Sequence, residues 1–204
     1  MKYLLDRGYA KTTALNLVAN RYRLSVDSRN RLVRYVYSDE DIRVHRSKLV
    51  PVKQIAGEDV VVDAYNVLIT SQAILSGKEV VCGMDGFVRD ASAVFSKYRF
   101  DAPSRKVAAA VLKILAEHKP RSVLFILDSQ MSKSGELAGY LREEMKKFSV
   151  PGDAKTKRNA DYSIKRLNRI TLTSDSAIIE KVDRVADVPR ELLGRRDLFK
   201  SRQS

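Results

Sequence analysis

Short continuous apolar runs alternate with longer amphipathic stretches over residues 54–204. The runs are "DVVVDA", "EVVCG", "SVLFILD" and "ITLTS". Continuous runs rich in β-branched residues are typical of strands buried on both faces, and most of the runs are followed by a stretch with helical periodicity. This alternation predicts an α/β domain in which a mostly parallel open sheet is flanked by helices.

Residues 1–53 have a different pattern, with apolar positions three and four residues apart and no continuous run. The pattern predicts three short helices, the third of which Ser25 is placed to cap. Around Pro51 and Gly57 the helical period disappears. We therefore expect a small all-helical N-terminal domain over residues 1–53 and the α/β domain over residues 54–204.

The charge of the chain favours nucleic acid as its partner. The 204 residues include 38 Lys and Arg against 25 Asp and Glu, a formal net charge of +13. Such an excess attracts phosphate polymers, although a solvated basic surface gives the same composition. Arg21 and Arg23 in the N-terminal helices are candidate nucleic-acid contacts, in a helix-turn-helix or in a helical appendage that only packs.

Nothing in the sequence predicts a membrane partner. No apolar stretch approaches the roughly 18 residues of a membrane span, and Asp6 and Arg7 interrupt the start before a secretory segment forms. A cytoplasmic location is therefore expected. The single cysteine, Cys82, lies in a strand-like context and is expected to be buried. The oligomeric state stays open, with a homodimer among the options.

Three of the predicted strands end in an acid, at Asp63, Asp128 and Asp175, and Asp161 begins the helix before the last of them. The carboxyl ends of parallel strands share one edge, so these side chains are expected to converge there. Four nearby carboxylates repel each other unless a cation neutralises them, and Mg²⁺ or Mn²⁺ prefers oxygen ligands. We expect Asp63, Asp128 and Asp161 to be close enough to coordinate one ion, with Asp175 at its margin.

Each acid also has a structural interpretation. Asp161 and Asp175 are placed to act as first-turn acids that favour a helix N-terminus. Asp128 before "SQ" has the sequence of an Asx turn. Asp63 would be satisfied by an arginine. The single site remains the stronger expectation, because four such coincidences at one edge are less frequent than one shared cause.

A basic stretch, "PGDAKTKRNAD", ends at Asp161. We expect it to form a loop in which Lys155, Lys157 and Arg158 lie beside the acids and hold a phosphate backbone. The alternative is a loop that is merely solvated.

Several segments resemble a known nuclease superfamily. "VVVDAYNVL" resembles the opening motif of the NYN branch of the PIN-like nucleases, with alanine where that branch usually has glycine. "LFILD" and "ADYSIKRLNRITLTSD" resemble its later acidic segments. The whole chain also resembles an uncharacterised archaeal family in which a helical domain of unknown function, with the signature "LLDRGYAKTTALNLVANRYRLS", precedes a PIN-like domain.

The resemblance implies a metal-dependent nuclease, most often one that acts on RNA. Asp63, Asp128, Asp161 and Asp175 would be catalytic ligands of Mg²⁺ or Mn²⁺, directly or through water, and Asn66 would orient a ligand or a water molecule. The alternatives are a non-catalytic nucleic-acid-binding module and a protein-interaction module on a degenerate PIN-like fold.

Overall fold

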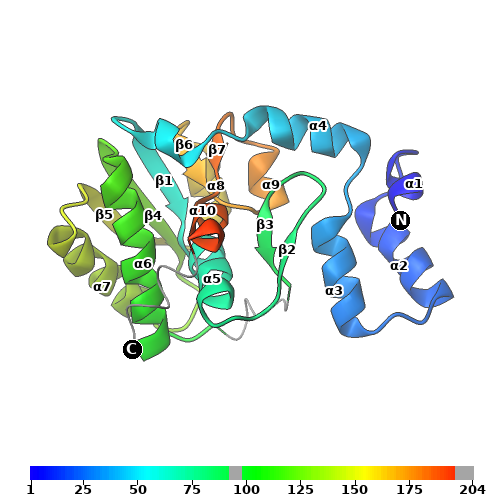
Figure 1. Cartoon of the computed structure of the whole chain (residues 1–204), viewed down its shortest axis with the longest axis horizontal. Coiled ribbons are helices and arrows are strands. Elements are labelled where there is room, and N and C mark those ends of the chain that lie inside the picture. Colours follow the sequence, from blue (N-terminus) through cyan, green and yellow to red (C-terminus); the bar gives the residue numbers. More distant parts are fainter. Residues whose placement is uncertain (92–97, 196–204) are drawn as a thin grey trace.

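The computed structural model describes residues 1–91 and 98–195. Its centre is a five-stranded parallel sheet, which confirms the predicted α/β class, with helices on both faces and further helices at the N-terminus (Figure 1). The strand order is β5-β4-β1-β6-β7. The strands are β1 (Asp59–Asp63), β4 (Ser122–Asp128), β5 (Gly152–Lys157), β6 (Ile170–Leu172) and β7 (Val185–Ala186).

The apolar runs form the middle strands of this sheet. These strands have a neighbouring strand on each side and helices on both faces, so their side chains are buried on both faces. Val62 of β1 lies in register between Phe125 of β4 and Leu172 of β6. Successive side chains of a strand point to opposite faces. Val62 accordingly joins the larger core and Val61 the smaller one.

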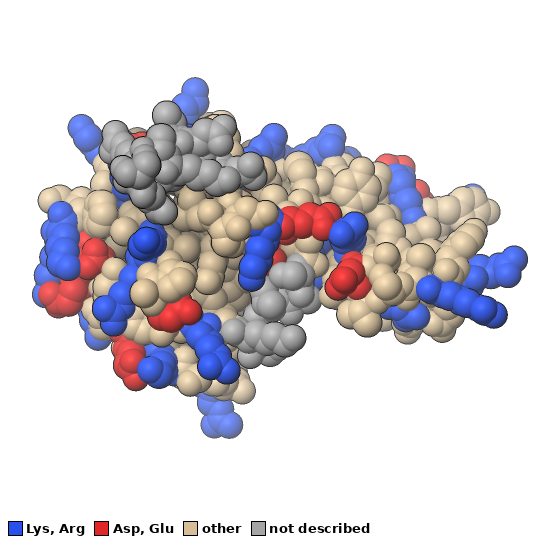
Figure 2. All heavy atoms as spheres, turned by 60° about the horizontal axis from the view of Figure 1, so that its bottom comes forward, with Lys and Arg blue, Asp and Glu red and all other residues tan. Residues whose placement is uncertain are grey.

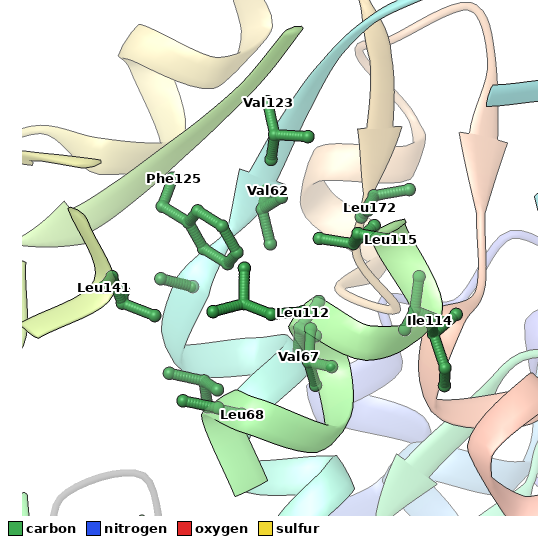
Figure 3. Close-up of a cluster of buried hydrophobic side chains, with 14 of the residues drawn as sticks. Val62, Val67, Leu68, Leu112, Ile114, Leu115, Val123, Phe125, Leu141 and Leu172 are labelled. Atoms are coloured by element: carbon green, nitrogen blue, oxygen red, sulfur yellow. The ribbon is translucent and has the colours of Figure 1, made fainter. Parts of the chain in front are cut away.

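The larger core lies under α5 (Ala64–Leu75), α6 (Ala102–His118), α7 (Ser134–Lys147) and α10 (Val188–Gly194). Figure 3 shows Leu112 of α6 pointing towards Val62 and Phe125 of the sheet. The smaller core lies under the short helices α8 (Ala160–Lys165) and α9 (Ser176–Ile179). A capping box between Asp101 and Ser104 begins α6.

The segment predicted as a basic loop is instead the edge strand β5. It pairs in parallel with β4 along its whole length, although only Ala154 of the strand is buried. A polar edge strand has no apolar run to reveal it, since one side of its backbone faces solvent. Gly152 begins the strand because the backbones approach closely there: a Cβ atom would lie 1.8 Å from the Val123 carbonyl oxygen.

A small antiparallel hairpin, β2 (Val80–Cys82) and β3 (Val88–Asp90), lies between the sheet domain and the N-terminal helices. Cys82 ends β2 with its side chain exposed, so the expectation of a buried thiol was wrong. The hairpin is too short to enclose both of its faces.

The N-terminal region contains four helices rather than three: α1 (Lys2–Leu5), α2 (Lys11–Arg21), α3 (Val26–Tyr35) and α4 (Asp39–Lys48). Ser25 caps α3 as expected, by accepting the Ser28 amide at 3.2 Å. The helix that was missed, α4, is highly charged, and it begins at a capping box between Ser38 and Asp41. The sequence therefore indicates this helix by its capping residues and not by the spacing of apolar residues.

The helix α4 joins the two regions. In Figure 1 it runs across the top, from above α9 and the hairpin towards α3, whereas α1–α3 lie on one side. Its last residue, Lys48, donates to the Ile179 carbonyl at 2.9 Å, and Leu49 forms a bridge with Val185 of β7. A short 3₁₀ helix (Val52–Ile55) then leads into β1. No helix within residues 1–91 and 98–195 combines the length and the apolar character needed to cross a membrane.

Candidate functional site

Asp63 is half-buried at the end of the central strand β1, where the chain turns into α5. The Thr173 hydroxyl donates to its Oδ2 atom at 2.9 Å, and no cation of the described residues forms an ion pair with it. Burial raises the pKa of the Asp63 carboxyl to about 7; the Thr173 hydrogen bond opposes the rise, and the charges of Asp175 and Asp161 add to it. Asp63 thus has a hydroxyl partner and not the arginine of its alternative structural interpretation, and no cation among the described residues compensates its charge.

The loop between β6 and α9 places Asp175 beside Asp63 through Thr173. The Thr173 hydroxyl oxygen accepts the Asp175 amide at 3.1 Å while it donates to Asp63. The Asp175 Oδ1 atom accepts the amides of Ala177 and Ile178 at 2.8 and 3.4 Å, so Asp175 caps α9. The structural interpretation of Asp175 therefore holds, and it also lies near enough to raise the pKa of Asp63.

Asn66 holds the same loop from the first turn of α5. Its Oδ1 atom accepts both the amide and the hydroxyl of Ser174, at 2.8 and 3.0 Å. The Ser174 carbonyl in turn accepts a hydrogen bond from the Arg89 Nε atom at 2.8 Å. Asn66 therefore positions the loop that carries Asp175. Its orientation of a ligand or a water molecule stays a prediction.

Asp128 and Asp161 lie together in a shallow pocket with Arg158 and Lys165. The Asp128 Oδ1 atom accepts the Gln130 amide at 2.8 Å, as in the Asx turn considered from the sequence. Asp161 is exposed in the first turn of α8. The four acids thus occupy one edge of the sheet as two neighbouring pairs.

The acids are less tightly gathered than expected. Across residues 1–91 and 98–195, no three His, Cys, Asp or Glu side chains lie close enough together to hold one ion. The expectation that Asp63, Asp128 and Asp161 form one such group therefore differs from the structure. The hydrogen bonds at the strand ends explain this, because Asp63 accepts from the Thr173 hydroxyl whereas Asp128 accepts from the Gln130 amide of its own turn.

Of the three predicted basic residues, Lys155 and Lys157 belong to β5 and Arg158 directly follows it; Lys157 and Arg158 lie beside this edge. Lys157 is the register partner of Asp128, and Arg158 lines the same pocket as Asp161. Lys155 lies two residues before Lys157, further from the edge, and its Nζ atom is 3.4 Å from the Oδ2 atom of Asp153. All three basic side chains are exposed.

Arg21 and Arg23 are exposed at the end of α2. Figure 2 shows Lys and Arg side chains projecting from the end of the molecule where the N-terminal helices lie. Large apolar side chains are exposed in the same region. Six of the seven such side chains among the described residues belong to residues 1–35: Tyr3, Tyr9, Leu17, Tyr22, Val26 and Tyr35.

A cleft of about 240 Å³ separates the N-terminal helices from the acidic edge. Lys11, Arg34 and Tyr37 line it from the helical side, and Asn66 and Asp175 line it from the sheet domain. Sequence reasoning did not identify Lys11 or Arg34 as site residues. Neither belongs to a local motif, since their roles depend on contacts between distant parts of the chain.

Comparison with known proteins identifies relatives of both regions. Residues 52–191 match the family described as a domain of unknown function, DUF5616, and residues 1–48 match the protein family of unknown function DUF434. An uncharacterised protein of Methanocaldococcus jannaschii is 39% identical over 194 residues, which cover 94% of this chain and 92% of the relative. No solved structure matches the chain. The chain therefore belongs to the DUF5616 family and carries a DUF434 region ahead of that domain.

Proposed function

We propose that the protein is a divalent-cation-dependent nuclease that hydrolyses phosphodiester bonds, with RNA as the first candidate substrate. The observation that carries the proposal is the uncompensated charge at the carboxyl edge of the sheet. There Asp63 is half-buried, and Asp175 and Asp161 raise its pKa further. A divalent cation would relieve this repulsion.

The donor set fits Mg²⁺ or Mn²⁺. Mg²⁺ commonly keeps several water molecules and takes one or two carboxylates together with substrate phosphates, so three converging acids are not required. Asp63 and Asp175, which Thr173 links, are the residues that would hold it, directly or through water. Asp161 and Asp128 would lie in the neighbouring pocket. When bound, such an ion polarises phosphate oxygens and activates water for hydrolysis.

The remaining residues have positioning and binding roles in this proposal. Thr173 fixes the Asp63 carboxylate, and Asn66 fixes the loop that carries Asp175. Lys157 and Arg158 lie beside Asp128 and Asp161, where cations would hold the phosphates of the strand that is cut. The exposed arginines and tyrosines of the N-terminal helices are suited to contact further phosphates and unpaired bases.

A second candidate is a nucleic-acid-binding protein without catalytic activity. It is favoured by the separation of the acids into two pairs and by the backbone hydrogen bonds that Asp175 and Asp128 accept. In this alternative the same basic surfaces bind nucleic acid, and the acids stabilise turns and caps.

Metal dependence separates the two candidates. Labelled single-stranded RNA and DNA should be incubated with the protein in Mg²⁺, Mn²⁺ or EDTA, and the products resolved by length. We expect cleavage with a metal and none in EDTA, and we expect Asp161→Asn to abolish it. Asp183→Asn is the matched control, because Asp183 is an exposed acid outside both pockets. Tight binding without cleavage under every condition would favour the second candidate.

A further inference from the structure

The cleft between the N-terminal helices and the acidic edge has an unusual balance of charge. Lys11, Arg34 and Arg89 line it, together with the carboxylates of Asp90 and Asp175. Asp175 is engaged in capping α9, and Asp90 is buried in the wall. The three cations differ in how many hydrogen bonds and ion pairs they form with the protein. The cations that form few of them are the ones available to an anionic ligand.

Arg89 is fully engaged by the protein. Its two terminal nitrogens donate to the two carboxylate oxygens of Asp85 at 2.8 and 2.6 Å, and its Nε atom donates to the Ser174 carbonyl. It is buried, and His45 also contacts Asp85 at 2.8 Å. Arg89 therefore builds the wall of the cleft and has little capacity to bind a ligand.

Lys11 is in the opposite situation. It is half-buried with its Nζ atom 3.4 Å from the centre of the Tyr37 ring, and it forms no ion pair with any carboxylate in residues 1–91 and 98–195. Burial and the charge of Arg89 lower the pKa of Lys11 to about 8, although the charges of Asp85, Asp41 and Glu180 oppose this shift without forming an ion pair. Lys11 is also the first residue of α2, where the helix dipole disfavours a positive charge.

Arg34 is the second cation without a carboxylate partner among the described residues. It is half-buried, and its side chain donates only to the Asn30 carbonyl at 3.3 Å. A guanidinium has five N–H donors in a planar fork that suits phosphate. Two partly desolvated cations without an ion-pair partner among the described residues thus line the cleft that Asp175 also lines. An anionic ligand would offset the cost of burying both charges.

We propose that this cleft is a phosphate-binding site, in which Lys11 and Arg34 hold a phosphate group of the nucleic acid whose strand continues to the acidic edge. The choice of a nucleic-acid phosphate over other anions rests on the proposed function, because Asn66 and Asp175 line the same cleft. The DUF434 region would then contribute directly to the substrate site of the DUF5616 domain.

Binding in EDTA tests the site without any need for turnover. The probe is a fluorescein-labelled ten-nucleotide RNA, with affinity followed by fluorescence anisotropy. Lys11→Met and Arg34→Met should each weaken binding about tenfold, as expected for loss of a charge-assisted contact, and should make the salt slope shallower by about one. Lys11→Arg should stay within about threefold of the unchanged protein.

Lys53→Met is the matched control. Lys53 is exposed outside the cleft, so this variant removes the same charge without touching the site. We expect it to bind within about twofold of the unchanged protein. Equal weakening by Lys11→Met and Lys53→Met would overturn the proposal. Thermal unfolding must show that Lys11→Met is folded, and the loss of an unfavourable charge should leave its melting temperature unchanged or higher.

Two further measurements keep the inference separate from the proposed function. Lys11 should be acetylated by acetic anhydride at pH 8 faster than Lys53, and RNA should protect it, as read by peptide mass spectrometry. Protection of neither lysine would also overturn the site. If Lys11→Met weakens binding but no metal supports cleavage, the phosphate site stands and the nuclease proposal fails.

The source of the phosphate is decided with paired oligonucleotides. The ten-nucleotide RNA should be compared with and without a 5′-phosphate, and inorganic phosphate should be added as a competitor. A Lys11-dependent gain from the 5′-phosphate assigns a strand end, and equal affinities assign an internal phosphate of the backbone. Either result supports the site, provided that the affinity depends on Lys11.

Discussion

The sheet domain and the N-terminal helices treat their apolar side chains in opposite ways. In the sheet domain, Val60, Val61 and Val62 are completely buried between two helical layers. The core beneath α1–α3 has only Leu5, Ala14 and Val36 as its buried members. α3 has no buried residue at all, and most of the exposed large apolar side chains of the described chain lie in these helices.

This difference indicates that one region provides most of the folding stability and the other provides surface for binding partners. Apolar burial is the dominant favourable term in folding, so the sheet domain supplies most of the stability. The N-terminal helices keep tyrosines and arginines on their surface, where these side chains are available for partners. What attaches the helices to the sheet domain is largely polar: His45 of α4 and Arg89 of β3 both contact the buried carboxylate of Asp85.

The largest expected effect is the loss of chemistry in Asp63→Asn, because the catalytic charge is assigned to the sheet domain alone. Cleavage should fall at least about 1,000-fold, which corresponds to about 4 kcal/mol, while RNA binding through the helices is retained. A parallel loss of binding would show that the two regions do not divide the work in this way.

The same variant should stabilise the metal-free protein. The folded-state pKa of Asp63, about 7, lies above the ordinary value of 3.8, so the unchanged protein loses stability as pH rises from about 4 to 7. In EDTA at pH 8, Asp63→Asn should therefore melt at the same or a higher temperature, and its advantage should shrink at pH 5. A marked drop in melting temperature at pH 8 would identify Asp63 as a structural residue.

The next prediction concerns the buried polar contacts among His45, Asp85 and Arg89, called the polar joint below. Asp85→Ala leaves Arg89 buried without its partner, and this should cost about 3–5 kcal/mol in urea unfolding. Asp59→Ala is the control, since Asp59 makes the same two-pronged contact with Arg121 at the surface. There the cost should be much smaller, because solvent screens an exposed ion pair. Similar costs for the two variants would mean that the joint contributes no more than a surface ion pair.

Acid should loosen the joint before it unfolds the sheet. Burial alone would raise the pKa of Asp85, but the hydrogen bonds from Arg89 and His45 outweigh it and lower the pKa to about 2. The resulting stabilisation, about 2 kcal/mol, is complete above pH 4 and is lost as pH falls towards 2. Hydrogen exchange should show α4 losing protection in this range while β1 and β4 keep theirs; simultaneous loss would argue for a single cooperative unit.

The smallest effects are expected from the two exposed basic surfaces. Each of two triple alanine variants should weaken RNA binding about tenfold and make the salt slope shallower, with unfolding free energies within about 0.5 kcal/mol of the unchanged protein. The variants change Arg21, Tyr22 and Arg23 in one case, and Lys155, Lys157 and Arg158 in the other. If only the second variant alters binding, the N-terminal surface serves another partner.

The sequence by itself determined the α/β class and the central strands, because a strand buried on both faces must be a continuous apolar run. Val60 to Val62 and the run before Asp128 satisfy this condition locally. The acids at the strand ends were visible for the same reason, since each comes where an apolar run stops. Ser25 as a cap was likewise a local signal.

Only the tertiary structure decided the features that depend on distant parts of the chain. The strand β5 has a polar sequence and exists because β4 offers it an open edge. The pairing of the acids depends on where Thr173 and the Asp128 turn direct each carboxylate. Lys11 is an ordinary lysine in the sequence, and it is a desolvated cation beside the acidic edge only because α4 and the hairpin bring the N-terminal helices there.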